Sequence, residues 1–137
     1  MAALSAARMT KSRSPGRLVA YKVTSWETVY AGGLVMISSA GTAQAAAASA
    51  SNQGCVGVAT ATVTGSAAGE TVVVQEGIFL FDGDSLAQTA VGAKVYADDD
   101  HPVDETQATN CPVAGICVEF VSASSAWVDV SLANSKH

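Results

Sequence analysis

Apolar and polar residues alternate in short runs along this chain, and glycine, serine or aspartate separates one run from the next. Val56 and Val58 share one face of such a run, and the longest run spans residues 71–82. A period of two is typical of half-buried β-strands, whose successive side chains point to opposite faces. From residue 18 onward the sequence holds about eight of these runs. They predict an all-β fold, a small antiparallel β-barrel or β-sandwich.

The same alternation predicts which side chains fill the core. Gly77 interrupts the longest run, so we expect a bend there and a possible change of face after it. In residues 113–121 the pattern places Cys117 and Glu119 outward. Near the C-terminus it places Leu132 inward with two valines. The predicted core residues are Val56, Val58, Val72, Val74, Ile78, Leu80, Ile116, Val118, Phe120, Val128 and Val130.

Two segments lack this alternation. Residues 1–17 are predicted to form an extended, irregular arm, because Ser14-Pro15-Gly16 breaks any helix before the first apolar run. Residues 43–50 are rich in alanine but have no apolar stripe, so we expect a loop with at most one helical turn. Gly32-Gly33 predicts a tight turn or a bulge. The chain therefore divides into an arm, residues 1–17, and a β domain, residues 18–137.

Charge is distributed very unevenly between the two ends of the chain. Residues 1–22 hold five of the seven basic side chains and no acid, whereas residues 23–137 hold two basic side chains and all twelve acids. An acidic domain argues against direct nucleic-acid binding, and no apolar stretch is long enough for a membrane-spanning helix. The composition of the arm also resembles a mitochondrial transit peptide, which is an alternative reading of the basic residues.

The densest group of chemically active side chains is the acidic turn, residues 98–105, with Asp98, Asp99, Asp100, His101, Asp104 and Glu105. Carboxylates in this number could bind a cation, but their spacing does not fit a calcium loop. Aspartates favour turns and stay hydrated, so a solvated hairpin tip is the expected structure. A ligand-binding or enzymatic role of this turn is the alternative hypothesis.

The sequence holds no other pattern typical of catalysis. No serine or cysteine stands in a nucleophile motif, and no glycine-rich phosphate loop is present. Cys55, Cys111 and Cys117 lack zinc-pair spacing, and we expect buried thiols, with a disulfide as the alternative. We therefore expect no enzymatic activity, no cofactor and no metal.

Basic and aromatic side chains are the candidate partner contacts. Seventeen extended residues can span up to ~55–60 Å, so we expect the arm to lie along a neighbouring molecule. Aromatic side chains placed outward on a strand or in a connecting segment often mark a contact surface. The candidate contact residues are Arg8, Lys11, Arg13, Arg17, Lys22, Trp26, Tyr30 and Trp127.

The order of the strand motifs resembles that of the capsid cement, or head-decoration, proteins of tailed bacteriophages. The motifs are TVYAGGLVMIS, GCVGVAT, GETVVVQEGIFLFDG, VGAKVYADDDHPV and AGICVEFVSASSAWVDV, and they cover about Val23 to Ser131. The alanine-rich segment, the three cysteines and the arm depart from the family pattern.

This resemblance implies a structural protein of the virion that binds the outer surface of the assembled capsid. Such proteins bridge neighbouring major capsid protein subunits, often as homotrimers and sometimes as dimers. The resemblance therefore implies two partners, the major capsid protein and other copies of this chain. It also implies synthesis in the host cytoplasm.

Overall fold

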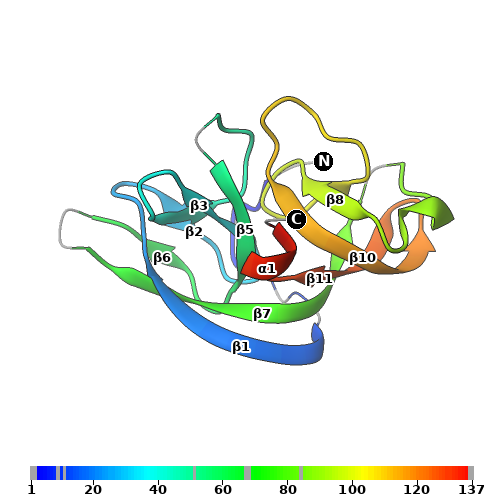
Figure 1. Cartoon of the computed structure of the whole chain (residues 1–137). Coiled ribbons are helices and arrows are strands. Elements are labelled where there is room, and N and C mark those ends of the chain that lie inside the picture. The colour runs from blue at the N-terminus through cyan, green and yellow to red at the C-terminus, as the bar shows by residue number, and fades with distance from the viewer. Residues whose placement is uncertain are drawn as a thin grey trace.

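The computed structural model describes residues 3–8, 10, 12–50, 52–66, 69–83 and 85–135. The main element of the fold is a strongly curled antiparallel sheet that resembles half of a barrel (Figure 1). The predicted all-β class is confirmed. The main sheet contains β1 (Ser12–Lys22), β3 (Leu34–Ser38), β4 (Ala43–Ala45), β5 (Asn52–Ala59), β7 (Thr71–Asp82), β8 (Lys94–Ala97), β9 (Val103–Asp104), β10 (Val113–Ser122) and β11 (Ser125–Val130). A separate small sheet pairs β2 (Thr28–Val29) with β6 (Val63–Thr64). Two single turns of helix complete the fold, the 3₁₀ turn η1 (Gln88–Ala90) and α1 (Leu132–Ser135).

Strand β7 is the branch point of the main sheet. Gln75 pairs with both β1 and β5, and Gly77 pairs with both β1 and β11. Because a strand residue has one neighbour on each side, β5 and β11 share the edge of β7 that lies opposite β1. The β5–β3–β4 and β11–β10–β8–β9 branches therefore leave β7 one after the other along a single edge.

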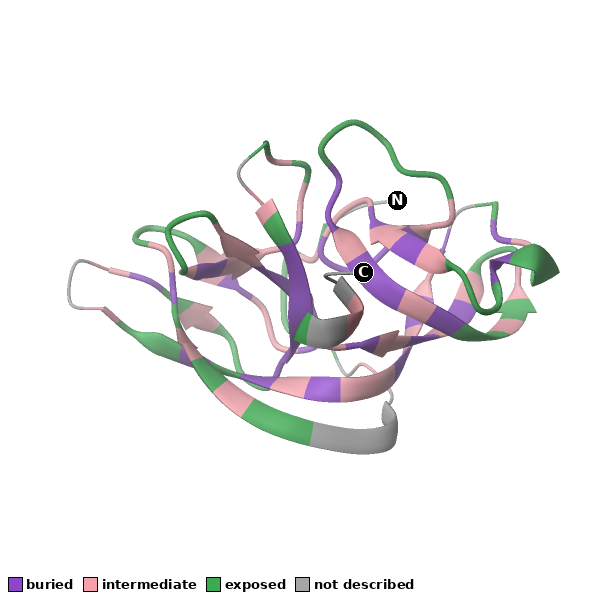
Figure 2. Ribbon diagram, in the orientation of Figure 1, coloured by how far each residue is buried: buried purple, intermediate pink, exposed green. Residues whose placement is uncertain are grey.

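The two halves of β7 pack against two separate cores, and strands β3 and β5 contribute residues to both. A small core lies beside the first half of β7 and consists of Val23, Val29, Val35, Ala43, Val56, Ala59, Val72 and Val74. A larger core lies beside the second half and includes Leu34, Met36, Phe79, Phe81, Val95 and Val128. The buried positions of the two cores appear as purple segments in Figure 2. Six of the predicted core residues are confirmed as buried: Val56, Val58, Val72, Val74, Val128 and Val130.

The predicted faces are wrong in the second half of β7. Ile78 and Leu80 are only half-buried, and Phe79 and Phe81 point into the core instead. Gly77 changes the face here, as its position within the run led us to expect.

The predicted faces are also wrong in β10. Val118 is exposed, Ile116 and Phe120 are half-buried, and Cys117 is fully buried. Register shifts at 113/115, 117/119 and 120/122 break the alternation of this strand. Leu132 is exposed as well, because the chain leaves β11 and turns into α1 before reaching it.

Two segments contain strands that the pattern did not predict. The alanine-rich segment includes β4, which pairs with β3, and no helix forms in residues 43–50. At the N-terminus, β1 begins at Ser12 and runs across the predicted boundary after residue 17. It pairs with β7 along most of its length. Whether residues 1–17 act as a functionally separate arm stays a prediction.

Candidate functional site

Residues 3–8 and Thr10, here called the strap, precede β1 and fold back onto their own domain. The Leu4 N–H donates to Oδ1 of Asp100 at 2.7 Å, and the Arg8 N–H donates to the Ala31 carbonyl at 2.8 Å. The Thr10 hydroxyl donates to the Gly32 carbonyl. The described part of the strap therefore lies along its own chain in this structure, and the expected contact of the arm with a neighbouring molecule stays a prediction.

The surface that receives the strap, here called the seat, consists of Ala31, Gly32, Gly33, Asp82 and Asp100. The guanidinium of Arg8 donates to both carboxylate oxygens of Asp82, at 2.7 and 3.3 Å. This hydrogen bonding is the main reason why the pKa of Asp82 lies below its ordinary value. One oxygen of Asp82 also lies 3.3 Å from Nδ1 of His101. The seat thus presents two carboxylates to a basic segment.

The acidic turn is not the solvated hairpin tip that we expected. His101 is 1% exposed and Asp100 is 2% exposed, and Pro102 and Val103 are also buried. The ring of His101 packs against Phe81, with the ring centroids 5.3 Å apart. Burial lowers the pKa of His101 to about 4, and the nearby Arg8 charge contributes to the lowering. The turn therefore belongs largely to the core.

Two carboxylates of this turn, Asp99 and Asp100, already accept hydrogen bonds within the protein. Asp100 accepts the strap N–H, and its pKa is raised mainly by burial. Oδ1 of Asp99 accepts the Asp100 N–H at 3.1 Å. Within the part of the chain that the structure describes, no group of three or more His, Cys, Asp or Glu side chains is placed to hold a metal ion.

Arg17 lies in β1 and donates a hydrogen bond to Glu76, which lies in β7. Its Nε donates to Glu76 at 3.0 Å, and the Leu132 N–H donates to the same carboxylate at 3.4 Å. Glu76 is buried, whereas the side chain of Arg17 is 78% exposed. Glu76 thus connects β1 with the start of α1, and Arg17 keeps most of its surface free for a partner.

The other candidate contact residues lie in different environments. Trp26 is 78% exposed, in the turn between β1 and β2, and Lys22 is exposed at the end of β1. Tyr30 and Trp127 are half-buried. Lys11 and the side chain of Arg13 lie outside the described part of the structure.

Sequence reasoning missed an exposed apolar surface, here called the outer face. It consists of Leu18, Ala20 and Lys22 of β1 and Val73 of β7. Ala20 is the direct cross-strand partner of Val73, and Leu18 and Val73 are 63% and 41% exposed. The alternation of residues 18–22 carries the signal for this surface, because Lys22 shares its face with Leu18 and Ala20. The green segments of β1 in Figure 2 mark part of it.

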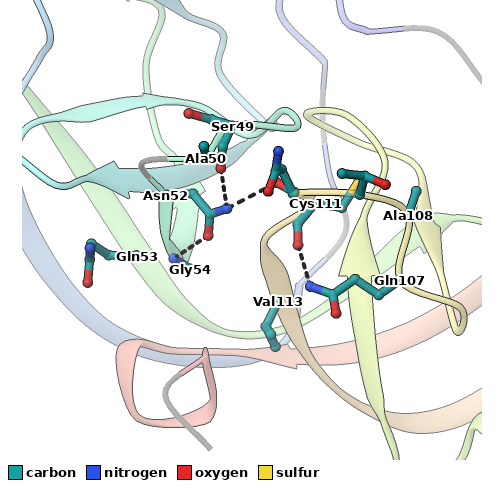
Figure 3. Close-up of a pocket in the computed structure, with 11 residues that line it drawn as sticks. Ser49, Ala50, Asn52, Gln53, Gly54, Gln107, Ala108, Cys111 and Val113 are labelled. Atoms are coloured by element: carbon teal, nitrogen blue, oxygen red, sulfur yellow. Dashed lines mark hydrogen bonds between the residues drawn. The ribbon is translucent and has the colours of Figure 1, made fainter.

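A polar groove of about 640 Å³ lies between residues 49–54 and residues 107–113 (Figure 3). The amide of Asn52 donates to the carbonyls of Ser49 and Asn110, at 2.7 and 3.0 Å. The amide of Gln107 donates to the Cys111 carbonyl at 3.0 Å. The bond between Asn52 and Asn110 joins the two loops, and the other two bonds each lie within one loop.

The three cysteines are buried and unpaired within the chain. Burial raises the pKa of each thiol, most strongly for Cys55. Among the described residues, no helix has the length and apolar character needed to cross a membrane.

Comparison with known proteins gives one match. No curated protein and no solved structure matches the chain. The sequence model of one family, described as phage cement protein, matches residues 14–132. That match begins in β1, includes both cores and ends at the start of α1. Because it covers most of the chain, the resemblance in the strand motifs is confirmed, and the chain belongs to the phage cement protein family, whose members have a structural role in the capsid.

Proposed function

We propose that this protein binds the outer surface of an assembled phage capsid and stabilises it by bridging neighbouring major capsid protein subunits. The observation that carries this proposal is the family match over residues 14–132. The outer face supports it, because a folded chain that exposes apolar strand residues next to basic ones offers a surface for a protein partner.

The contact surface that we propose combines the outer face with the basic and aromatic residues around β1. Leu18 and Val73 supply apolar area, and Arg17 and Lys22 supply positive charge. Trp26 has the size and exposure of an interface anchor. Arg8 contributes indirectly, because its bond to Asp82 holds the strap on the seat. The remaining candidate contacts are Lys11, Arg13, Tyr30 and Trp127.

The partners in this proposal are the major capsid protein and other copies of the chain. We expect a homotrimer, with a dimer as the alternative, made in the host cytoplasm and added to the outside of the shell. The excess of acid in residues 23–137 is unfavourable for direct contact with the packaged nucleic acid.

We also propose that the protein has no catalytic activity. The acidic turn was the strongest catalytic candidate, and its central residues Asp100 and His101 are buried beneath the strap. A substrate would have to displace the strap to reach them. The structure thus favours the capsid role over the ligand-binding alternative.

The test is reconstitution on capsids assembled without this protein. Adding the purified chain should fill a fixed number of sites per capsid and raise the temperature at which the capsid loses its DNA. Equal thermal and osmotic resistance of decorated and bare capsids would contradict the proposal.

Variants of the outer face identify the surface used. Leu18→Ser should lower occupancy and leave the far-ultraviolet circular dichroism spectrum unchanged, because Leu18 is exposed. Val121→Ser is the matched control, since Val121 is 52% exposed on the β10–β11 hairpin. Loss of occupancy with Val121→Ser but not with Leu18→Ser would place the contact on the hairpin instead.

A further inference from the structure

The seat is shaped to receive a peptide backbone. Gly32 has φ +86°, and a Cβ at this position would overlap the carbonyl oxygen of Arg8. A Cβ on Gly33 would come within 3.3 Å of Cδ1 of Leu4. The paired glycines therefore leave space for the strap, which explains them better than the expected tight turn alone.

The seat also carries polar groups that depend on an occupant. Asp100 is 2% exposed, and one of its oxygens accepts the N–H of Leu4. Without the strap this oxygen would lose a charge-assisted hydrogen bond, which is stronger than a hydrogen bond between neutral groups. At the other end of the seat, Asp82 pairs with Arg8. The seat thus recognises a backbone N–H and, four residues later, a guanidinium.

The strap is bound through a few local contacts and can be separated from β1. No residue of its described part belongs to a β-strand, and the β1–β7 pairing begins only at Ser12. Its ion pair with Asp82 is partly exposed and therefore contributes little by itself. The contacts of the strap are thus separate from the strand pairing of β1.

We propose that the seat binds the strap of a second copy of this chain, so that neighbouring copies exchange their N-terminal segments. Each copy carries both the strap and the seat, so exchange preserves every contact and costs only the rearrangement of the linking residues. The charges agree with this choice, because the strap carries Arg8 and no acid, whereas the rest of each copy has twice as many acidic as basic side chains. Copies held side by side would exchange at high effective concentration.

The length of the strap limits which copies can exchange. Seven residues from Leu4 to Thr10 span at most ~25 Å when extended. Exchange therefore requires copies in contact with each other. It would turn adjacent subunits into a linked set, and it does not depend on which capsid protein lies beneath them.

Complementary charge variants of the full chain test this proposal in solution. In R8E the strap cannot bind its own seat, and in D82K the seat cannot bind its own strap. A mixture restores opposite charges only between copies, because the strap of each variant then meets the seat of the other. Native mass spectrometry should therefore detect mixed dimers or trimers in the mixture and monomers in each variant alone. The double variant R8E/D82K is the control for folding, because it restores opposite charges both within one chain and between copies, and it should behave like the unaltered chain.

A second measurement covers the case in which the charge variants do not fold. A labelled peptide of residues 3–10 should bind the full-length R8A chain, whose seat has lost the ion pair with its own strap, and should bind the R8A/D82N chain several-fold more weakly. No peptide binding to folded R8A would overturn the proposal, as would a mixture of folded R8E and D82K that contains monomers only. Both experiments are performed without capsids, so their failure is distinguishable from failure of the proposed capsid role.

Discussion

The two halves of β7, before and after Gly77, pack against cores of different composition. Before Gly77, Val72 and Val74 point into a small core made entirely of apolar residues, most of them valine or alanine. After Gly77, Phe79 and Phe81 point into a larger core, with their ring centroids 6.3 Å apart. The ring of His101 packs against Phe81, in the second half.

The difference between the halves follows from the branching of the sheet. The first half lies between β1 and β5, and the second half lies between β1 and β11. A strand that passes from one partner to another must adjust its twist, and Gly77 provides the adjustment with φ +150°. One glycine thus allows a single strand to serve two cores and to hold the seat residue Asp82 at its far end.

The largest expected effect is the loss of an aromatic ring from the second half. Phe81→Ala should lower the free energy of unfolding by ~3–5 kcal/mol, because it removes a fully buried ring and leaves a cavity. Val74→Ala, the matched change in the first half, should cost about 2 kcal/mol, since it removes two methyl groups. Urea unfolding of both variants measures the difference. Equal losses would mean that the two cores contribute alike.

Acid should weaken the second half through His101. Its pKa is about 4 in the folded protein and near 6.5 in the unfolded chain. The unfolded state therefore binds a proton at a pH where the folded state does not. The free energy of unfolding should be highest above pH 6.5 and should fall by on the order of 3 kcal/mol as the pH decreases to 4.

The control for this pH dependence is His101→Phe, which keeps an aromatic ring beside Phe81. Urea unfolding between pH 7 and pH 4 should then show a much flatter profile. The pKa of Asp82 is lowered, so loss of its charge acts below this pH range. An unchanged pH profile in the variant would show that His101 is not the group that titrates.

Replacing Gly77 tests the boundary between the halves directly. Gly77→Ala places a side chain on a residue with φ +150°, which should cost roughly 1–3 kcal/mol. Hydrogen exchange should show faster opening on both sides of residue 77, because each half depends on the bend. Gly41→Ala is the control, since Gly41 also has a positive φ but an added Cβ there would have no atom within 4 Å. A comparable loss for Gly41→Ala would mean that backbone strain alone decides the cost.

The first half of β7 was predictable from the sequence and the second half was not. Val72 and Val74 follow the plain alternation of a strand with fixed neighbours, and both are buried as predicted. Ile78 and Leu80 continue the same alternation in the sequence, but the bend at Gly77 turns Phe79 and Phe81 inward. Periodicity shows that a strand exists. It does not show how many residues a bend or a bulge consumes, as β10 also demonstrates.

The candidate site was predictable only in part, because its geometry depends on contacts between distant segments. Trp26 and Lys22 are exposed, which agrees with the expectation that basic and aromatic side chains near β1 face outward. The pairing of Arg8 with Asp82 joins residues 74 positions apart, and nothing local in either segment indicates it. The burial of Asp100 likewise depends on the strap and on the strand that follows Gly33. A run of aspartates predicts a turn but not what covers it.

The smallest effect on stability is expected at Val73, between the two buried valines of the first half. Val73 is 41% exposed on the outer face, so Val73→Thr should change the free energy of unfolding by no more than ~0.5 kcal/mol. Threonine keeps the branched shape that a strand favours and replaces a methyl group with a hydroxyl. If the outer face contacts the capsid, the same change should reduce occupancy on bare capsids, because a hydroxyl would enter an apolar contact. Val73→Ile, which keeps that surface apolar, should retain occupancy, and equal occupancy of the two variants would remove Val73 from the contact surface.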